Sequence, residues 1–254
     1  MSPTVSIADA PPGTETLAVP WVSVAVPGLG VMPAAVARPP GAGPFPTVLL
    51  LHGTHGFAQE YVRLAQDLAR GGLLAVAACW FQGGSGAGSR FITPIVCPES
   101  PPSPDPLSPE AVRTVDALVQ AVRTLPGARP DRIALFGHSR GGGAALNYIL
   151  RVGNVQAAVL NSARYPRQLT QLSPQLRVPI LMLHGTSDSP ADGGTESTNI
   201  QMAREFEEAL RAAGKPVEAM YYEDGRHNGI FDSSTQYRDE VQRMLAFLLH
   251  HLRD

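Results

Sequence analysis

The sequence predicts an α/β fold, in which a mostly parallel central sheet carries helices on both faces and an antiparallel hairpin at one edge. Short apolar runs such as Val48–Leu51 lack alternation, as expected of strands that are buried on both faces. Stretches with apolar residues at helical spacing lie between these runs, and strands that alternate with helices form a mostly parallel sheet. The chain has 254 residues, of which 44% are hydrophobic and 17% charged, and can therefore bury the core of one such domain.

The N-terminal part differs in composition from the rest of the chain. Residues 1–18 are rich in Pro, Thr, Ala and Asp and predict a loose tail, so that a single folded domain is expected over residues 19–254. Val19–Val26 and Val31–Arg38 are joined by Pro27-Gly-Leu-Gly30, which is typical of a turn. They predict the hairpin at the edge of the sheet.

Strands and helices are expected to alternate beyond the hairpin. After the strand Val48–Leu51, apolar residues from Phe57 to Leu68 recur at helical spacing until a Gly-Gly pair stops the helix. Ser108 and Pro109 are expected to supply the cap and first turn of the next helix. The other strands are expected at Leu73–Ala78, Asp131–Gly137, Val155–Leu160, Val178–His184 and Val217–Tyr222, and the other helices at Val112–Val122, Gly143–Leu150, Met202–Ala213 and Tyr237–Leu248.

One short motif carries the clearest chemical signal. Gly137-His-Ser139-Arg-Gly141 lies between a predicted strand and an alanine-rich predicted helix. Small residues on both sides of a serine allow a sharp turn from strand to helix, which holds the hydroxyl clear of the fold. The motif in this context indicates that Ser139 is a nucleophile.

A serine hydroxyl is a weak nucleophile unless a base accepts its proton, and the expected order after this kind of turn is Ser, then Asp or Glu, then His. Asp188 follows the strand Val178–His184, and His227 follows the strand Val217–Tyr222. The loops after the carboxyl ends of parallel strands meet at one edge of the sheet, where active sites of open α/β folds form.

We therefore expect Ser139 to attack a carbonyl carbon, His227 to accept and return its proton, and Asp188 to orient the imidazole. Asp192 and Glu196 lie on the same loop or just after it and are alternatives for the carboxylate. Asp188 is preferred because it is closest to the end of the strand.

The tetrahedral intermediate of such a reaction needs hydrogen-bond donors for its oxyanion. One donor is expected to be the backbone N–H of Arg140, directly after the nucleophile. The other should come from the loop His52–Gly56 after the first central strand, with Thr54 as first choice and His55 as second.

Several motifs together resemble the α/β-hydrolase superfamily over roughly residues 19–254: a strand followed by a His-Gly loop, G-H-S-x-G-G, G-T-x-D and a late D-G-x-H. Within it, Met32–Pro39 and Leu73–Phe81 resemble the dienelactone hydrolase group. The elbow Gly-His-Ser-Arg-Gly-Gly is also similar to that of chlorophyllase-type esterases. The dienelactone hydrolase group usually has cysteine as nucleophile, so the serine at 139 points to the serine esterases nearby. The superfamily implies acyl transfer to water from esters, thioesters, lactones or amides.

The expected function is that of a serine hydrolase that cleaves small-molecule carboxylic esters through a covalent acyl-enzyme. An acyltransferase, thioesterase or lactonase with the same residues is the alternative, and so is a non-catalytic ligand-binding protein of the same fold. No metal or organic cofactor is expected: His52 and His55 form H-x-x-H, but a zinc site needs three or four ligands, and no supporting cluster follows.

Residues 82–109 form a long Gly- and Pro-rich connection, and connections of this length are usually functional or disordered. It begins after the strand Leu73–Ala78, so its root should lie beside Ser139. We predict a substrate-facing flap, with Arg90 and Phe91 facing the pocket, and an inert surface loop is the alternative. The side chain of Arg140 is expected to form ion pairs around the site, with binding of an acidic substrate as the alternative.

Charge and composition exclude several partners. The net charge of −2 gives no reason to expect nucleic acid or an anionic membrane, and no run approaches the ~18 apolar residues of a membrane span.

The first residues do not resemble a secretory signal, which predicts a cytoplasmic protein. A secreted protein with its signal removed is the alternative. Cys79 and Cys97 are expected to be free thiols, and a single bridge that tethers the loop is the alternative. The oligomeric state is left open.

Overall fold

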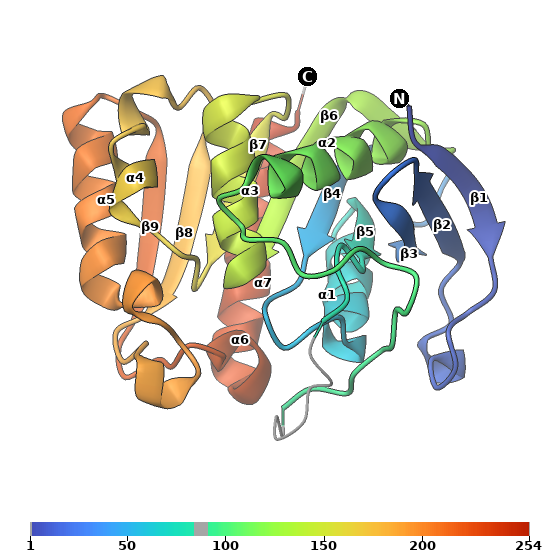
Figure 1. The fold of residues 1–254 in the computed structure, drawn as a ribbon, viewed down its shortest axis with the longest axis horizontal. Helices are drawn as coiled ribbons and strands as arrows, with labels where there is room; N and C mark the ends of the chain where they lie inside the picture. Colours follow the sequence, from blue (N-terminus) through green and yellow to red (C-terminus); the bar gives the residue numbers. More distant parts are fainter. Residues whose placement is uncertain (1, 84–90, 254) are drawn as a thin grey trace.

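The computed structural model describes residues 2–83 and 91–253, which form one sheet covered by helices (Figure 1). The strands are β1 (Thr4–Ala8), β2 (Trp21–Val26), β3 (Gly30–Ala37), β4 (Phe45–Leu51), β5 (Leu74–Ala78), β6 (Ala128–His138), β7 (Ala157–Asn161), β8 (Ile180–Gly185) and β9 (Val217–Tyr222). They lie in the order β1-β2-β3-β5-β4-β6-β7-β8-β9. Pairing is antiparallel from β1 through β3 to β5 and parallel from β5 to β9. The predicted fold class is therefore confirmed.

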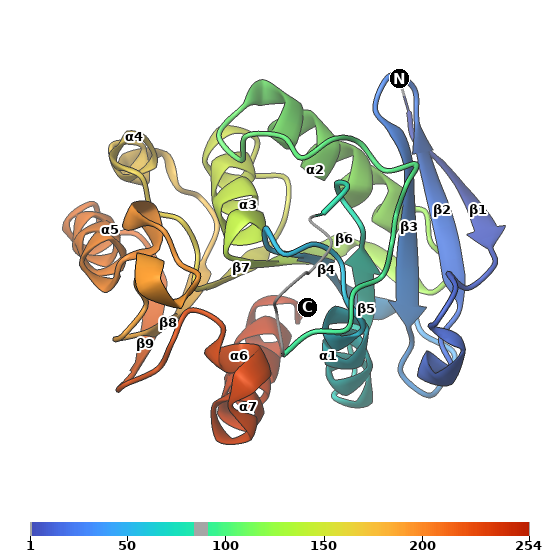
Figure 2. The same cartoon turned by 60° about the horizontal axis from the view of Figure 1, so that its bottom comes forward.

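Helices cover both faces of the sheet. They are α1 (Gln59–Arg70), α2 (Pro109–Arg123), α3 (Arg140–Arg151), α4 (Arg167–Thr170), α5 (Ile200–Ala212), α6 (Gly229–Asp232) and α7 (Ser234–His251). Figure 2 shows α1 and α7 on one side of the sheet and α2 and α3 on the other. Successive side chains of a strand point to opposite faces, so Val48 and Leu50 of β4 lie in the core cluster with α1 and α7, whereas Leu49 and Leu51 lie in the cluster with α2 and α3. The predicted cap of α2 is confirmed, because the Ser108 hydroxyl accepts from the N–H of Ala111 at 3.1 Å.

The prediction of a loose tail over residues 1–18 is wrong for two parts of that segment. Thr4–Ala8 is an edge strand that pairs antiparallel with β2, and a short 3-10 helix at Glu15–Leu17 buries Leu17 against the core. The predicted hairpin is present as β2 and β3, but β1 lies outside it. An edge strand of this kind buries little, and Ile7 is 94% exposed, so the composition of the segment does not reveal its pairing.

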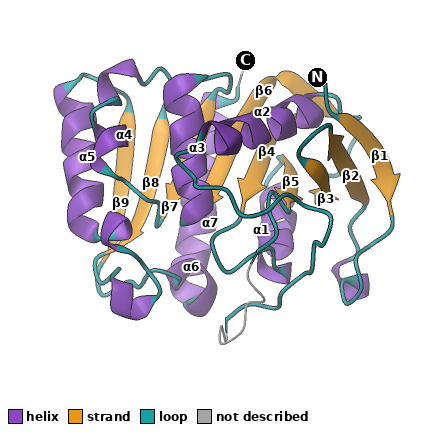
Figure 3. Ribbon diagram, viewed as in Figure 1, coloured by secondary structure: helices purple, strands orange, loops and turns teal. Residues whose placement is uncertain are grey.

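Figure 3 shows the connection from β5 to α2 as a loop, with no helix or strand in its described residues. Backbone hydrogen bonds hold it on the domain. The N–H of Ile95 donates to the carbonyl of Phe57, and the N–H of Val31 in β3 donates to that of Glu99. Cys79 and Cys97 form a disulfide, so the expectation of two free thiols is wrong. The bridge ties the end of β5 to the middle of the connection.

Removal of this disulfide is expected to lower the free energy of unfolding by about 3 kcal/mol, because the bridge restricts the unfolded chain over a separation of 18 residues. The measurement is denaturant unfolding of the Cys79→Ala/Cys97→Ala variant beside the wild type, with and without reductant. Reductant should destabilise only the wild type. Titration of two free thiols in the unfolded, unreduced wild-type protein would contradict the bridge.

Candidate active site

A strained turn at the end of β6 presents Ser139. The backbone of Ser139 has φ 52° and ψ −113°, a conformation that non-glycine residues rarely adopt and that often marks functional sites. Gly137 and Gly141 make the turn possible: a Cβ at Gly137 would lie 2.4 Å from the carbonyl oxygen of Gly141, and one at Gly141 would lie 2.3 Å from that of Leu51. The N–H of Ser139 donates to the carbonyl of Asn161 at 2.9 Å, which ties the turn to β7.

The three predicted triad side chains lie in one line of hydrogen bonds. His227 Nδ1 is 2.7 Å from Asp188 Oδ2, and His227 Nε2 is 2.9 Å from Ser139 Oγ. An ionised carboxylate can only accept, so Nδ1 carries the imidazole proton, and the lone pair of Nε2 faces the serine hydroxyl. All three residues are buried, with 7% or less of each exposed. The arrangement can therefore accept the hydroxyl proton and hold it on a ring beside a carboxylate.

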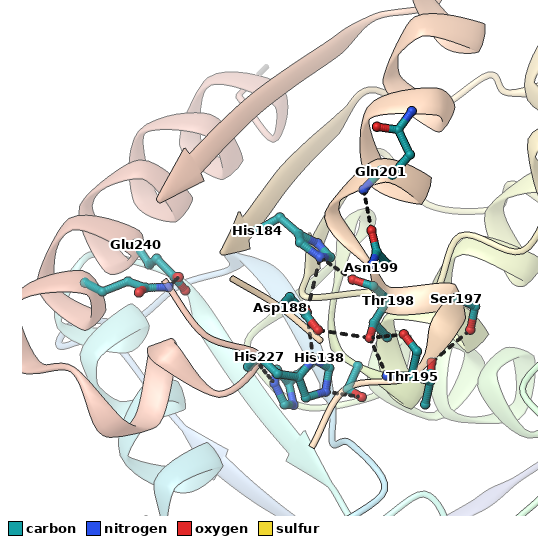
Figure 4. Close-up of polar contacts among 12 residues, drawn as sticks. His138, His184, Asp188, Thr195, Ser197, Thr198, Asn199, Gln201, His227 and Glu240 are labelled. Carbon is teal, nitrogen blue, oxygen red and sulfur yellow. Dashed lines mark hydrogen bonds and ion pairs between the residues drawn. The ribbon is translucent and has the colours of Figure 1, made fainter. Parts of the chain in front are cut away.

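Asp188 is held by more than the imidazole of His227 (Figure 4). The Thr198 hydroxyl donates to Oδ1 at 3.0 Å, and His184 Nε2 lies 3.2 Å from Oδ2 and 2.6 Å from the carbonyl oxygen of Thr198. Burial raises the pKa of Asp188, but the hydrogen bonds from His184 and His227 outweigh it and hold the pKa below the ordinary value. The carboxylate is therefore ionised at neutral pH. His184 is buried beside Asp188 and bonds it there.

Asp192 and Glu196 are the predicted alternatives for the carboxylate. Glu196 is exposed in a short 3-10 helix, Glu196–Thr198. Asp192 ends another short 3-10 helix, and its side chain lies outside the described part of the structure. Of the two described carboxylates, Asp188 is the one that bonds His227.

Asp188→Asn is expected to lower kcat by about 10⁴-fold. An amide at this position favours the imidazole tautomer with its proton on Nε2, which cannot accept from Ser139. The measurement is steady-state hydrolysis of p-nitrophenyl acetate, with Glu196→Gln as the matched control, because it removes an exposed carboxylate nearby. A loss of less than about 10-fold in Asp188→Asn would show that the carboxylate has no such role.

The predicted oxyanion loop lies against the elbow. A Cβ at Gly53 would be 2.8 Å from His138 Nδ1, so glycine allows this close approach. Arg140 Nε donates to the Thr54 hydroxyl at 3.2 Å, and its Nη1 donates to the carbonyl of Pro104 at 2.6 Å. Arg140 and Thr54 are thus brought together beside Ser139. The N–H of Arg140 lies at the first position of α3, where a backbone N–H has no partner within the helix.

The side chain of Arg140 has different partners from those predicted, and the His55 ring contacts Tyr61. His55 Nε2 is 2.8 Å from the hydroxyl of Tyr61. The Arg140 guanidinium bonds a hydroxyl and a carbonyl oxygen and lies over the ring of Phe81, and within the described residues it forms no ion pair. The role of each residue in oxyanion binding stays a prediction.

Of the two predicted flap residues, one can be placed. Phe91 lies edge-on to His55, with ring centroids 5.8 Å apart, and stacks parallel to Phe231 at 6.3 Å. Phe91 therefore packs at the border of the oxyanion loop. Arg90 belongs to residues 84–90, which lie outside the described residues. Contact of either residue with substrate is a prediction.

A buried carboxylate lies under the elbow, at a position that the sequence does not mark as part of the site. Glu240 of α7 accepts from Asn161 Nδ2 at 2.6 Å and from Gln236 Nε2 at 2.8 Å. Burial raises the pKa of Glu240 to about 8, and the two hydrogen bonds only partly offset this effect. The carbonyl of Asn161 also accepts from the N–H of Ser139, so Glu240 is connected to the turn at Ser139 through Asn161.

The raised pKa of Glu240 makes stability depend on pH. Between its unfolded pKa of about 4.5 and its folded pKa of about 8, the native state binds more protons than the unfolded state, so the free energy of unfolding falls as pH rises. Glu240→Gln should flatten this slope, whereas Glu208→Gln, at an exposed position, should leave it unchanged. Denaturant unfolding at several pH values is the measurement, and equal slopes in wild type and Glu240→Gln would contradict the assignment.

Metal ligation and membrane insertion find no support in the described chain. Among residues 2–83 and 91–253, no group of three or more His, Cys, Asp and Glu side chains is placed to hold a metal ion. In the same part of the chain, no helix is both long and apolar enough to cross a lipid bilayer.

Comparisons with known proteins show what the chain resembles in sequence and in fold. A sequence model of the "Dienelactone hydrolase family" matches residues 32–250. The protein named "Putative carboxymethylenebutenolidase" from Methylorubrum extorquens is 26% identical over 220 residues, which cover 83% of this chain and 72% of that protein. The solved "Putative Dienelactone Hydrolase" from Klebsiella pneumoniae superposes with a TM-score of 0.67 at 22% identity, over 98% of this chain and 99% of that one. The esterase Pf2001 from Pyrococcus furiosus gives a TM-score of 0.71 at 14% identity, over 99% and 98%. These solved structures share the α/β-hydrolase fold.

Proposed function

The chain belongs to the dienelactone hydrolase family and is a hydrolase of the ester or lactone type, and on that premise we propose that it cleaves carboxylic esters through a covalent acyl-enzyme on Ser139. The resemblance to this family that the sequence indicates is confirmed. The observation that carries the proposal is the line of hydrogen bonds from Ser139 through His227 to Asp188.

The first half of the reaction forms the acyl-enzyme. Ser139 Oγ bonds to the ester carbonyl carbon while its proton passes to His227 Nε2, and the carbonyl π electrons move onto oxygen. The N–H groups of Arg140 and Thr54 would stabilise this oxyanion. Asp188 stays ionised and stabilises the imidazolium. When the tetrahedral intermediate collapses, the bond to the alkoxy oxygen breaks and His227 protonates the departing alcohol.

The second half releases the acid. A water molecule gives its proton to His227 Nε2 and adds to the acyl carbon, and the new tetrahedral intermediate expels Ser139 Oγ, which regains the proton. The nucleophile is the Ser139 hydroxyl in the first half and a water molecule in the second, and each must give up a proton when it attacks. His227 must therefore be neutral before each attack. The chemistry needs no metal or organic cofactor and no partner beyond a small-molecule ester.

Lactonase, thioesterase and acyltransferase activity would use the same residues. A lactone differs only in that its leaving alcohol stays tethered to the acyl group, and the name of the Methylorubrum extorquens relative gives that alternative specific support. An acyltransferase would pass the acyl group to an alcohol or amine in place of water. A non-catalytic binder is disfavoured because the three triad side chains are present and aligned.

The experiment is steady-state turnover on p-nitrophenyl esters of graded acyl length and on five- and six-membered lactones, with and without an added alcohol. Release of free acid whose rate is unaffected by the alcohol supports a hydrolase, whereas transfer to the alcohol supports a transferase. Absence of turnover on the whole panel, together with no labelling by a fluorophosphonate, would contradict the proposed activity.

The location of the protein is a separate proposal. The Cys79–Cys97 disulfide favours an oxidising compartment, where such bonds persist.

A further inference from the structure

Tyr61 connects parts of the site that the chain brings from far apart, although the reaction steps above make no use of it. Its ring is buried in the first turns of α1, with 1% of the residue exposed. The hydroxyl has three partners: the N–H of Gly53 at 2.9 Å, His55 Nε2 at 2.8 Å and His138 Nδ1 at 3.1 Å. Gly53 and His55 flank Thr54 in the oxyanion loop, and His138 directly precedes the nucleophile.

The direction of each hydrogen bond follows from the number of donors. His138 Nε2 lies 3.4 Å from the carbonyl oxygen of His227, which can only accept, so Nε2 carries the proton and Nδ1 is an acceptor. The Tyr61 hydroxyl must then donate its one proton to His138 Nδ1. Its oxygen has two lone pairs, which accept from the N–H of Gly53 and from His55 Nε2–H.

Both histidines are neutral at physiological pH, which this assignment requires. Burial lowers the pKa of His55 to about 4, and the nearby His227 adds to the effect. Burial also lowers the pKa of His138 well below its ordinary value, with His227 and His55 contributing. Each neutral ring has one donor and one acceptor, so the four hydrogen bonds form a directed chain without conflict.

We propose that Tyr61 is a positioning residue, whose hydroxyl fixes the oxyanion loop at Gly53 and His55 relative to the elbow at His138 and the loop that carries His227. The proposal rests on the function proposed above.

The consequence concerns the distance between the oxyanion donor and the nucleophile. The Tyr61 hydroxyl bonds Gly53 and His55, the two neighbours of Thr54 in the chain. The same hydroxyl bonds His138, the residue before Ser139. A displacement of about 1 Å at a reacting centre can reduce the rate by about 10²-fold. The oxyanion exists only in the transition state and the tetrahedral intermediates, so a looser loop should affect kcat more than KM.

The test is Tyr61→Phe, which keeps the buried ring and removes only the hydroxyl. Tyr148→Phe is the matched control: Tyr148 is also fully buried, and its hydroxyl bonds Asp116 at 3.1 Å on the far part of α3. On p-nitrophenyl acetate, Tyr61→Phe is expected to lower kcat by about 10- to 100-fold with KM changed by less than about 3-fold, and Tyr148→Phe should keep the wild-type kcat.

A second readout separates positioning from general loss of stability. Phenylboronic acid adds to a serine hydroxyl as a tetrahedral anion and occupies the oxyanion site. Its affinity should fall in Tyr61→Phe by the same factor as kcat/KM. A kcat within about 2-fold of wild type, or a boronate affinity that stays constant while kcat falls, would overturn the proposal.

His55 supplies a test that does not disturb the core, because its side chain is only partly buried. His55→Gln keeps an N–H donor for Tyr61 and His55→Phe does not, so the Gln variant should be faster by about 5-fold. The double variant Tyr61→Phe/His55→Phe should lose little more kcat than Tyr61→Phe alone, because both changes remove hydrogen bonds of the same network. Equal rates of the two His55 variants, or fully multiplicative losses in the double variant, would overturn the proposal even if Tyr61→Phe does not fold. Absence of ester hydrolysis in the wild type would refute the proposed function instead.

Discussion

Ser139→Ala is expected to lower kcat for p-nitrophenyl acetate by about 10⁴- to 10⁶-fold. The change removes the oxygen atom that attacks the ester carbonyl carbon and carries the acyl group in the proposed reaction. It leaves in place the backbone donors that would serve a water attack, so a low background rate should persist. The variant keeps a non-glycine residue at the strained position of φ 52°, and the fold should therefore be retained.

The matched control for this change is Ser187→Ala, which removes an exposed hydroxyl next to Asp188 and should leave kcat unchanged. Circular dichroism and the thermal midpoint of both variants establish that they are folded. Ser139→Ala with more than about a tenth of the wild-type kcat would exclude the serine mechanism.

His227→Ala is expected to cost about as much as the loss of the serine, since the two residues act as one unit. Without the imidazole, nothing accepts the proton from Ser139 Oγ, which the Nε2 atom faces at 2.9 Å. Removal of the ring also opens space beside the serine, so imidazole added to the buffer should restore part of the rate. The double variant Ser139→Ala/His227→Ala should be no slower than Ser139→Ala alone.

His250→Ala provides the control, because this histidine is exposed near the end of α7. Losses that multiply in the double variant would show that the two residues act independently. Such a result would contradict the hydrogen-bonded pair as the source of activity.

The sequence predicts much of the fold because most of the sheet is buried on both faces. Strands such as β4 and β8 are continuous apolar runs, and the helices between them carry apolar residues at regular spacing. The edge strand β1 lacks such a pattern because its residues are mostly exposed and its stability comes from pairing with β2. The disulfide is equally hard to predict, since two cysteines in a sequence do not reveal that folding brings their sulfur atoms together.

Some residues of the candidate site can be predicted from the sequence and others cannot. Ser139, Asp188 and His227 are predictable because each follows the end of a parallel strand, and such ends meet at one edge of the sheet. Tyr61 and Glu240 are not predictable as site residues. Helical spacing marks Tyr61 only as a member of the core, and the burial of Glu240 is known only from the structure. A tyrosine in place of phenylalanine at a core position, close after the oxyanion loop, is the one signal of a polar role.

The central claim is that Ser139 becomes acylated, and chemical labelling tests it most directly. The wild-type protein is treated with a fluorophosphonate, digested and mapped by mass spectrometry, with Ser139→Ala treated in parallel. The account predicts one adduct per chain, on Ser139, whose formation matches the loss of esterase activity, and none in the variant. An adduct on a different residue, or full activity in protein that carries the label, would contradict it.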